Sequence, residues 1–161
     1  MSNKYKPYDL SFKSKYLKPK FWPVWFGVLL LCILAFVPVT WRDGAAKAIA
    51  NRLYNLKMMQ RRKRIAKINL SMCFPEMDEA EQERIIRVNL ITFCQVVLGY
   101  AEANVRSIEH NRSRCVVHGG EHLFPLLEKE QACILLVPHT FAVDAIGLHI
   151  ASYGAPFCAM F

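Results

Sequence analysis

The sequence predicts an α/β protein in which an N-terminal membrane anchor helix precedes a domain with a mostly parallel sheet. Three observations support this fold class. Residues 21–41 form an apolar stretch without charge, and residues 79–105 carry apolar side chains at helical spacing. From residue 115 onward, short apolar runs alternate with helical segments. Such alternation is typical of parallel strands that are connected by helices.

The charge distribution indicates a membrane surface as a partner. The chain has 161 residues, the length of one domain, and a formal net charge of +8. Six lysines lie within the first twenty residues beside a single acid, Asp9, and a second basic cluster comprises Arg61, Arg62, Lys63 and Arg64. Because an apolar stretch lies between these clusters, we expect them to meet anionic lipid rather than nucleic acid, although a solvated face would also explain them.

The cysteines indicate a reducing environment. None of the six cysteines is paired in a C-x-x-C motif, so neither a zinc ribbon nor a thioredoxin-like site is expected. Most of them have apolar neighbours, where a free thiol behaves as a small hydrophobic group. We expect reduced thiols that face a reducing compartment and no metal site.

Residues 21–41 are predicted to anchor the chain in a membrane. As one helix they would extend about 31 Å, close to the thickness of the hydrocarbon core of a bilayer. Pro23 fits a first helical turn, whereas Pro38 would kink or end the helix, so the segment can either span the bilayer or dip into it. Tryptophans stand near both ends, as is typical of membrane interfaces: Trp22, Trp25 and Trp41. The predicted organisation is a basic segment (1–20), the anchor (21–41) and a cytoplasmic domain (42–161).

Two helices are expected next. Residues 45–59 predict a short amphipathic helix that lies on anionic lipid or packs within the domain. Asp78 and Glu81 form a capping-box-like start for a long helix that ends near Val105. An apolar stripe along this helix is predicted to face the core. Its members are Ile86, Leu90, Phe93, Val97 and Ala101.

The C-terminal part predicts the parallel sheet. Residues 115–118, 133–137 and 156–161 have the apolar character of strands, and residues 133–137 form a continuous run typical of a buried parallel strand. Helices are expected over 121–129 and 142–152, with Gly154 as a C-terminal stop. No helix follows the last predicted strand to cover its face. We therefore expect an interrupted domain, of which this chain is the front half.

One histidine and one aspartate carry the strongest chemical signal. His139 directly follows the predicted strand 133–137, and Asp144 stands about one turn into the next helix. Ligands of α/β folds bind at the carboxyl ends of parallel strands. On one continuous helix the two side chains would point about 140° apart. A turn between strand and helix would bring them together.

This pair suits acyl transfer to a hydroxyl group. An alcohol is a weak nucleophile at neutral pH, and His139 could remove its proton as it attacks a thioester carbonyl. Asp144 could hold the imidazole in the productive tautomer and stabilise the imidazolium. The substrate supplies the hydroxyl, so no nucleophilic serine or cysteine is needed. The H-x₄-D pattern alone is a weak signal, and its position after an apolar run and a membrane anchor strengthens it.

Several motifs resemble one enzyme family. The H-x₄-D pattern of His139 and Asp144 resembles the signature of glycerolipid and lipid A acyltransferases. The stretch 61–76 (RRKRIAKINLSMCFPE) is similar to a segment of the late-stage lipid A biosynthesis acyltransferases. The motifs at 120–123 (GEHL) and 136–139 (LVPH) also resemble that family. Asp144 in place of glutamate resembles the branch that adds the last, usually myristoyl, chain, and the resemblance covers residues 8–161.

The resemblance implies an activity and a location. It implies a bacterial inner-membrane enzyme with a glycerolipid-acyltransferase-like α/β domain on the cytoplasmic side, and with His139 and Asp144 as its catalytic dyad. The donor would be an acyl-acyl carrier protein, and no cofactor is expected. The acceptor would be a hydroxyacyl chain of a Kdo-bearing lipid A precursor. Arg61, Arg62, Lys63 and Arg64 would contact lipid phosphates or the acyl carrier protein.

Members of this family are about twice as long as this chain. Their C-terminal half would supply the rest of the sheet and further basic residues at the active site, so we expect the chain not to be active alone. Two alternatives remain: a glycerolipid acyltransferase, against which the N-L-x-x-C-F-P-E run argues, and a membrane-associated fragment without enzymatic activity.

Overall fold

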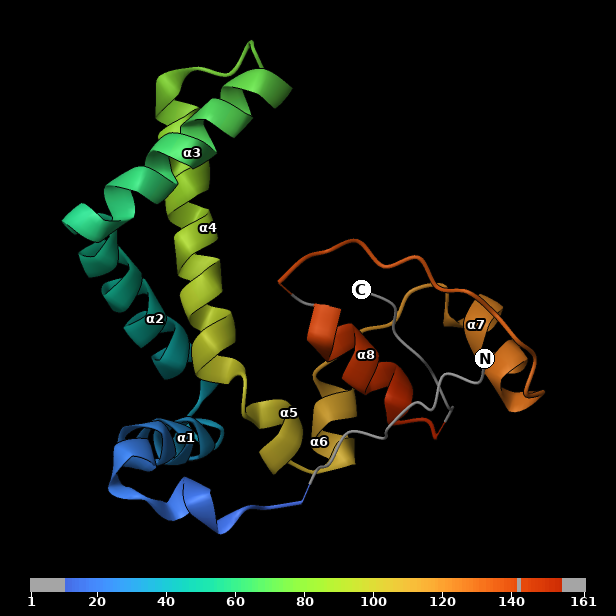
Figure 1. Ribbon diagram of the computed structural model, residues 1–161. Coiled ribbons are helices and arrows are strands. Elements are labelled where there is room, and N and C mark those ends of the chain that lie inside the picture. Colours follow the sequence, from blue (N-terminus) through green and yellow to red (C-terminus); the bar gives the residue numbers. More distant parts are fainter. Residues whose placement is uncertain (1–10, 142, 155–161) are drawn as a thin grey trace, which may run out of the picture.

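The computed structural model describes residues 11–141 and 143–154, and this part of the chain is built from helices (Figure 1). The 3₁₀ turns η1 (Ser14–Leu17) and η2 (Pro19–Phe21) come first. The α-helices that follow are α1 (Trp22–Leu34), α2 (Val39–Tyr54), α3 (Lys57–Cys73), α4 (Glu79–Gly99), α5 (Glu102–Val105), α6 (Ile108–Ser113), α7 (Gly120–Glu128) and α8 (Val143–Ala151).

The predicted α/β fold with a mostly parallel sheet is wrong for the described residues. Neither 115–118 nor 133–137 forms a strand, and the predicted strand 156–161 lies outside the described residues. Residues 133–137 have no regular secondary structure and lie at the surface, with Ile134 90% and Leu136 95% exposed. An apolar run becomes a strand only where a neighbour pairs with its backbone N–H and C=O groups. Composition indicates burial but cannot show whether that neighbour is there.

The predicted anchor segment is divided at Pro38. Helix α1 ends at Leu34, and α2 begins directly after Pro38. Thirteen residues of helix extend only about 20 Å, less than the roughly 30 Å of a hydrocarbon core. Most of the large side chains of α1 are exposed; among the most exposed are Trp22, Val24, Phe26, Leu29 and Ile33. The shorter of the two predicted arrangements, a helix that dips into the bilayer, fits this length.

Helices α2 and α4 form the principal packed pair (Figure 1). Arg42, Ala46, Ala50 and Tyr54 are buried and recur at every fourth residue, so they share one face of α2. Ala46 and Ala50 pack with Cys94 of α4 in a small apolar core. The short alanine side chains allow the two helix backbones to lie close together.

Tyr54 joins three helices at the end of α2. Its hydroxyl donates a hydrogen bond to the Glu83 carboxylate of α4. The Lys63 ammonium of α3 lies 3.7 Å from the centre of the Tyr54 ring, and the Arg87 guanidinium of α4 lies 4.1 Å from it. Cations over an aromatic ring are attracted by the negative potential of its face. This contact fixes α3 across the N-terminal half of α4.

The predicted start of the long helix, α4, is confirmed. Its end and part of its core-facing side differ from the prediction. The Asp78 carboxylate accepts a hydrogen bond of 2.7 Å from the Glu81 amide, and α4 begins at Glu79. Ile86 is buried as expected, but Phe93 and Val97 of the predicted stripe are exposed. The helix ends at Gly99 instead of Val105, because the short helix α5 turns away from its axis.

A charge cluster joins α2 to α5 and α6. Arg42 is buried, and it donates to the carbonyl of Leu34 at 3.2 Å and to the carboxylate of Glu102. His110 Nε2 lies 2.9 Å from Glu102, and its Nδ1 lies 3.2 Å from Arg106 Nη2. One neutral tautomer, with the proton on Nε2, satisfies both bonds. Arg42 therefore links the C-terminal end of α1 to the segment that leads into the C-terminal lobe, residues 108–154.

Candidate active site

His139 precedes α8, and Asp144 lies within that helix. His139 stands near the end of the irregular segment between α7 and α8, and Asp144 is in the first turn of α8. A carboxylate is favourable there because the N-terminus of a helix attracts negative charge. Both side chains are exposed, and no hydrogen bond or ion pair among the described residues joins them.

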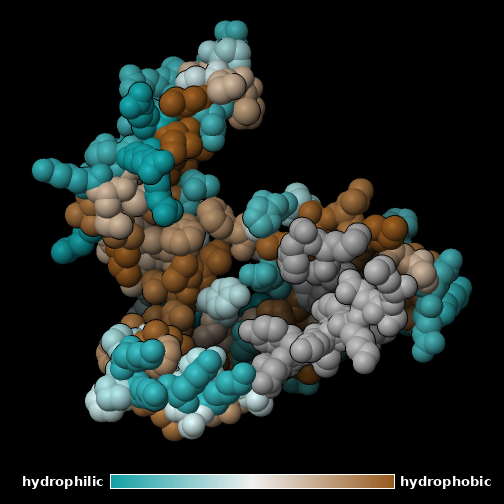
Figure 2. All heavy atoms as spheres, viewed as in Figure 1, coloured by the Kyte–Doolittle hydropathy of each residue, from teal (hydrophilic) through white to brown (hydrophobic). Residues whose placement is uncertain are grey.

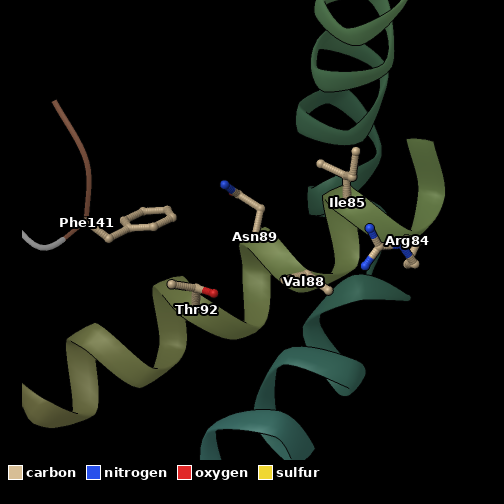
Figure 3. Close-up of a pocket in the computed structure, with 6 residues that line it drawn as sticks. All are labelled: Arg84, Ile85, Val88, Asn89, Thr92 and Phe141. Carbon is tan, nitrogen blue, oxygen red and sulfur yellow. The ribbon is translucent and has the colours of Figure 1, made fainter. Parts of the chain in front are cut away.

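Phe141 ties this turn to α4. The centroid of its ring lies 6.1 Å from that of Phe93. Across from Phe141, the α4 side chains Ile85, Asn89 and Thr92 help to line a concavity of about 230 Å³ (Figure 3). Neither His139 nor Asp144 lines it, and Phe141 is its lining residue from the segment that carries His139. The concavity is shallow and open.

The other end of α8 is held by Arg112 of α6. Arg112 Nε donates to Ser152 Oγ at 3.0 Å, and Nη2 donates to the Ser152 carbonyl. The guanidinium also lies 4.3 Å from the centre of the Tyr153 ring. Gly154 follows with a φ of +79°, which confirms the predicted stop after this helix. A cation at a helix C-terminus is favoured by the helix dipole, so Arg112 stabilises the C-terminal end of α8.

The predicted lipid or carrier contacts lie far from this pair along the chain, on α3. Arg61, Arg62 and Arg64 are exposed, and within the described ranges they form no ion pair. Lys63 is the exception, because its ammonium lies over the Tyr54 ring. Helix α3 packs on the N-terminal part of α4, while α8 lies in the C-terminal lobe (Figure 1). The structure therefore does not bring the basic cluster into contact with His139.

Patterns in the sequence did not identify three residues that connect the helices: Arg42, Glu102 and Arg112. Arg42 lies directly after the predicted anchor segment, residues 21–41. Its partner Glu102 is 60 residues away, and Arg112 is 40 residues from Ser152. No local pattern marks pairs so distant in sequence. Within residues 11–141 and 143–154, no cluster of His, Cys, Asp and Glu side chains has a geometry that could hold a metal ion.

Comparison with known proteins places these features in a family. The family model described as bacterial lipid A biosynthesis acyltransferase matches residues 10–161. A lipid A biosynthesis acyltransferase of Haemophilus influenzae is 33% identical over 154 residues, which cover 96% of this chain and 48% of that protein. The lipid A biosynthesis myristoyltransferase of Escherichia coli K12 is 33% identical over 154 residues, covering 96% of this chain and 47% of that protein. The lauroyltransferase of the same organism is 28% identical over 138 residues, 83% of this chain and 43% of that protein.

The chain spans about half the length of the curated relatives that it matches. No solved structure matches it.

Proposed function

Because the chain belongs to the bacterial lipid A biosynthesis acyltransferase family, we propose that it carries the catalytic pair and the membrane contacts of an O-acyltransferase of lipid A biosynthesis. The acyl group, myristoyl in this proposal, comes from an acyl-acyl carrier protein. The acceptor is the hydroxyl of a hydroxyacyl chain on a Kdo-bearing lipid A precursor. The position of Asp144 in the first turn of α8, with His139 in the segment just before that helix, is the observation that carries the proposal.

The chemistry follows from these two residues. His139 takes the proton of the acceptor hydroxyl as its oxygen attacks the thioester carbonyl, and the imidazolium then returns a proton to the departing thiolate. Asp144 accepts a hydrogen bond from the second ring nitrogen and stabilises the imidazolium. Catalytic hydrogen bonds are often not formed in a free enzyme and tighten when substrate is bound. The exposed, separate side chains of the free chain agree with such a closure.

The choice of myristoyl rests on similarity. Identity with the named myristoyltransferase is 33%, and with the lauroyltransferase it is 28%. Asp144, in place of glutamate, supports the same branch.

We propose the cytoplasmic face of the inner membrane as the location. Helix α1 presents aromatic and aliphatic side chains to its surroundings, and lysines precede it at positions 13, 15, 18 and 20. Its length suits insertion into one leaflet. The acyl acceptor is itself a membrane lipid, so an enzyme held at the surface meets it directly.

The test is transfer of a labelled myristoyl group from acyl carrier protein to a Kdo-lipid A precursor in membranes. The chain is assayed alone and together with the C-terminal half of the Haemophilus influenzae relative. His139→Ala is expected to reduce transfer at least about a hundredfold, the usual contribution of a general base. Asp144→Asn should also reduce it, whereas His118→Ala, at another exposed histidine, should not. Near-normal transfer by the His139 variant would contradict the assignment.

A further inference from the structure

Helix α3 has an outward face that combines apolar side chains with unpaired cations. At 100° per residue, positions 58, 61, 65, 68 and 72 lie on one side of the helix. Met58 is 72% exposed and Met72 is 77% exposed, and Ile65 and Ile68 are about half exposed. No acidic residue occurs between Lys57 and Cys73. Figure 2 shows hydrophobic and hydrophilic surface adjoining at this end of the molecule.

The cations of α3 divide into two groups. On the inner side, Lys67 pairs with Glu79 at 2.8 Å and with Glu83 at 3.0 Å, and Lys63 lies over the Tyr54 ring. On the outer side, Arg61 lies among the apolar side chains, while Arg62 and Arg64 border them on either side. These three arginines have no acidic partner among the described residues. The outer face is therefore both apolar and positively charged.

We propose that α3 lies flat on an anionic bilayer surface. In this arrangement Arg61, Arg62 and Arg64 contact the phosphates of lipid headgroups, and the exposed methionine and isoleucine side chains enter the boundary between headgroups and acyl chains. Basic amphipathic helices bind membranes in this way, through apolar burial and attraction to anionic lipid together. This contact is separate from α1, and it does not depend on the proposed acyl transfer.

The shape of the face favours a bilayer over an acidic protein. The apolar side chains are distributed over about 21 Å of helix, from position 58 to position 72. Methionine side chains are flexible and adapt to a fluid environment. A long, narrow apolar strip of this kind suits contact with an extended surface such as a bilayer. It suits contact with one docked side chain of a partner protein less well.

The second contact determines how the protein lies on the membrane. Helix α1 packs near the C-terminal end of α4, and α3 packs on its N-terminal half. The segment Glu79–Val105 is long and apolar enough to cross a bilayer by length and composition. However, α2 lies along α4 and carries exposed Lys47 and Arg52, which a crossing would carry into hydrocarbon. With both α1 and α3 on one surface, α4 lies along the bilayer.

Photo-crosslinking in the full chain tests this proposal. Benzoylphenylalanine replaces Met72, and the protein is reconstituted into vesicles of phosphatidylcholine with or without phosphatidylglycerol. The same photoreactive residue in place of Leu29 of α1 reports insertion of the first helix. The charge variant is Arg61→Gln, Arg62→Gln and Arg64→Gln. The matched control is Lys47→Gln, Arg52→Gln and Lys129→Gln, which removes the same charge at exposed positions outside α3.

We expect lipid adducts at position 72 that require phosphatidylglycerol. Each cation near an anionic surface changes binding about fivefold, so the three substitutions together weaken this contact by on the order of a hundredfold. The control variant should retain the adducts. The proposal is overturned if position 29 gives lipid adducts and position 72 gives none, or if the charge variant crosslinks normally. Adducts at position 72 with added acyl carrier protein instead of lipid would assign the face to an acidic protein.

Discussion

Glu102 is the residue at which several charges of the molecule meet. Its carboxylate accepts hydrogen bonds from Arg42 and His110, and Arg114 Nε lies 3.5 Å away. Burial raises the pKa of Glu102, but the hydrogen bonds from His110 and Arg42 and the charges of Arg42 and Arg114 outweigh it, so the pKa lies below its usual value. A carboxyl group whose pKa is lowered by folding stabilises the fold in its ionised form.

This lowered pKa predicts an acid sensitivity. The contribution of Glu102 is complete above the pKa of the unfolded chain, about 4.5, and is lost as the pH falls through the lower pKa of the folded state. At pH 7, Glu102→Gln should lower the melting temperature, and the difference from the wild type should shrink below about pH 4.5. Melting followed by circular dichroism in detergent measures this. Glu128→Gln, at an exposed carboxylate, is the control, and a difference that is constant with pH would contradict the prediction.

At the scale of helices, the α2–α4 pair depends on small side chains. Ala46 and Ala50 are almost completely buried, at 0% and 1% exposure, and each lies one turn from the next buried residue of α2. The guanidinium of Arg42 occupies the space beside Gly99, 3.6 Å from where a Cβ would stand. Larger side chains along this face would therefore separate the two helices.

Ala50→Leu tests this packing. The added atoms have no room between α2 and α4, and overpacking of this kind usually costs about 1–3 kcal/mol. We expect a lower midpoint in chemical unfolding for this variant. Ala48→Leu, at an exposed position of the same helix, should leave the midpoint nearly unchanged. Equal midpoints for the two variants would show that the helices do not pack closely at Ala50.

Local signals in the sequence predicted several elements correctly. The Asp78 cap, the helices near 121–129 and 142–152, and the Gly154 stop all depend on residues within one or two turns. The predicted bounds of the helix over 45–59 were wrong, because α2 begins at Val39 and ends at Tyr54. Amphipathic periodicity continues across that break and does not mark it. The predicted sheet failed for a different reason, since strand pairing depends on a partner that the run itself does not specify.

In the candidate site, the sequence predicted only those relationships that join residues close to one another in the chain. The proximity of His139 and Asp144 follows from a turn of a few residues. The contact of Phe141 with Phe93 and the contact of Arg112 with Ser152 join segments about forty or more residues apart. Such contacts depend on how the helices pack. No spacing pattern in a single sequence encodes them.

At the scale of the whole molecule, α1 to α4 form one arm and residues 108–154 form a second lobe (Figure 1). Helix α1 lies at the base of the first arm, near the junction with α5. The proposed membrane contacts therefore belong to the first arm, whereas His139 and Asp144 belong to the second lobe.

Deletion of residues 14–34 tests the division of membrane binding between α1 and α3. The wild type should stay with membranes in high salt, because apolar insertion is not screened by ions. The deletion variant should bind through α3 alone, and its binding should weaken strongly at about 1 M salt, because the contribution of the arginines is screened beyond about 3 Å. Sedimentation of membranes over a salt series measures this. Salt-resistant binding by the deletion variant, with aggregation excluded, would assign anchoring to another segment.

The exposure of residues 133–137 has a consequence for the proposed acyl transfer. A segment with few buried contacts belongs to the least stable part of a protein, so the turn with His139 that follows it is weakly preorganised. If only a fraction of molecules holds His139 and Asp144 in register, the apparent affinity for substrate, and with it the rate at low substrate concentration, is reduced by that fraction. A surface that covers Ile134 and Leu136 would raise the fraction without touching the substrate. Each tenfold gain in the competent population would then appear as a tenfold gain in activity at low substrate concentration.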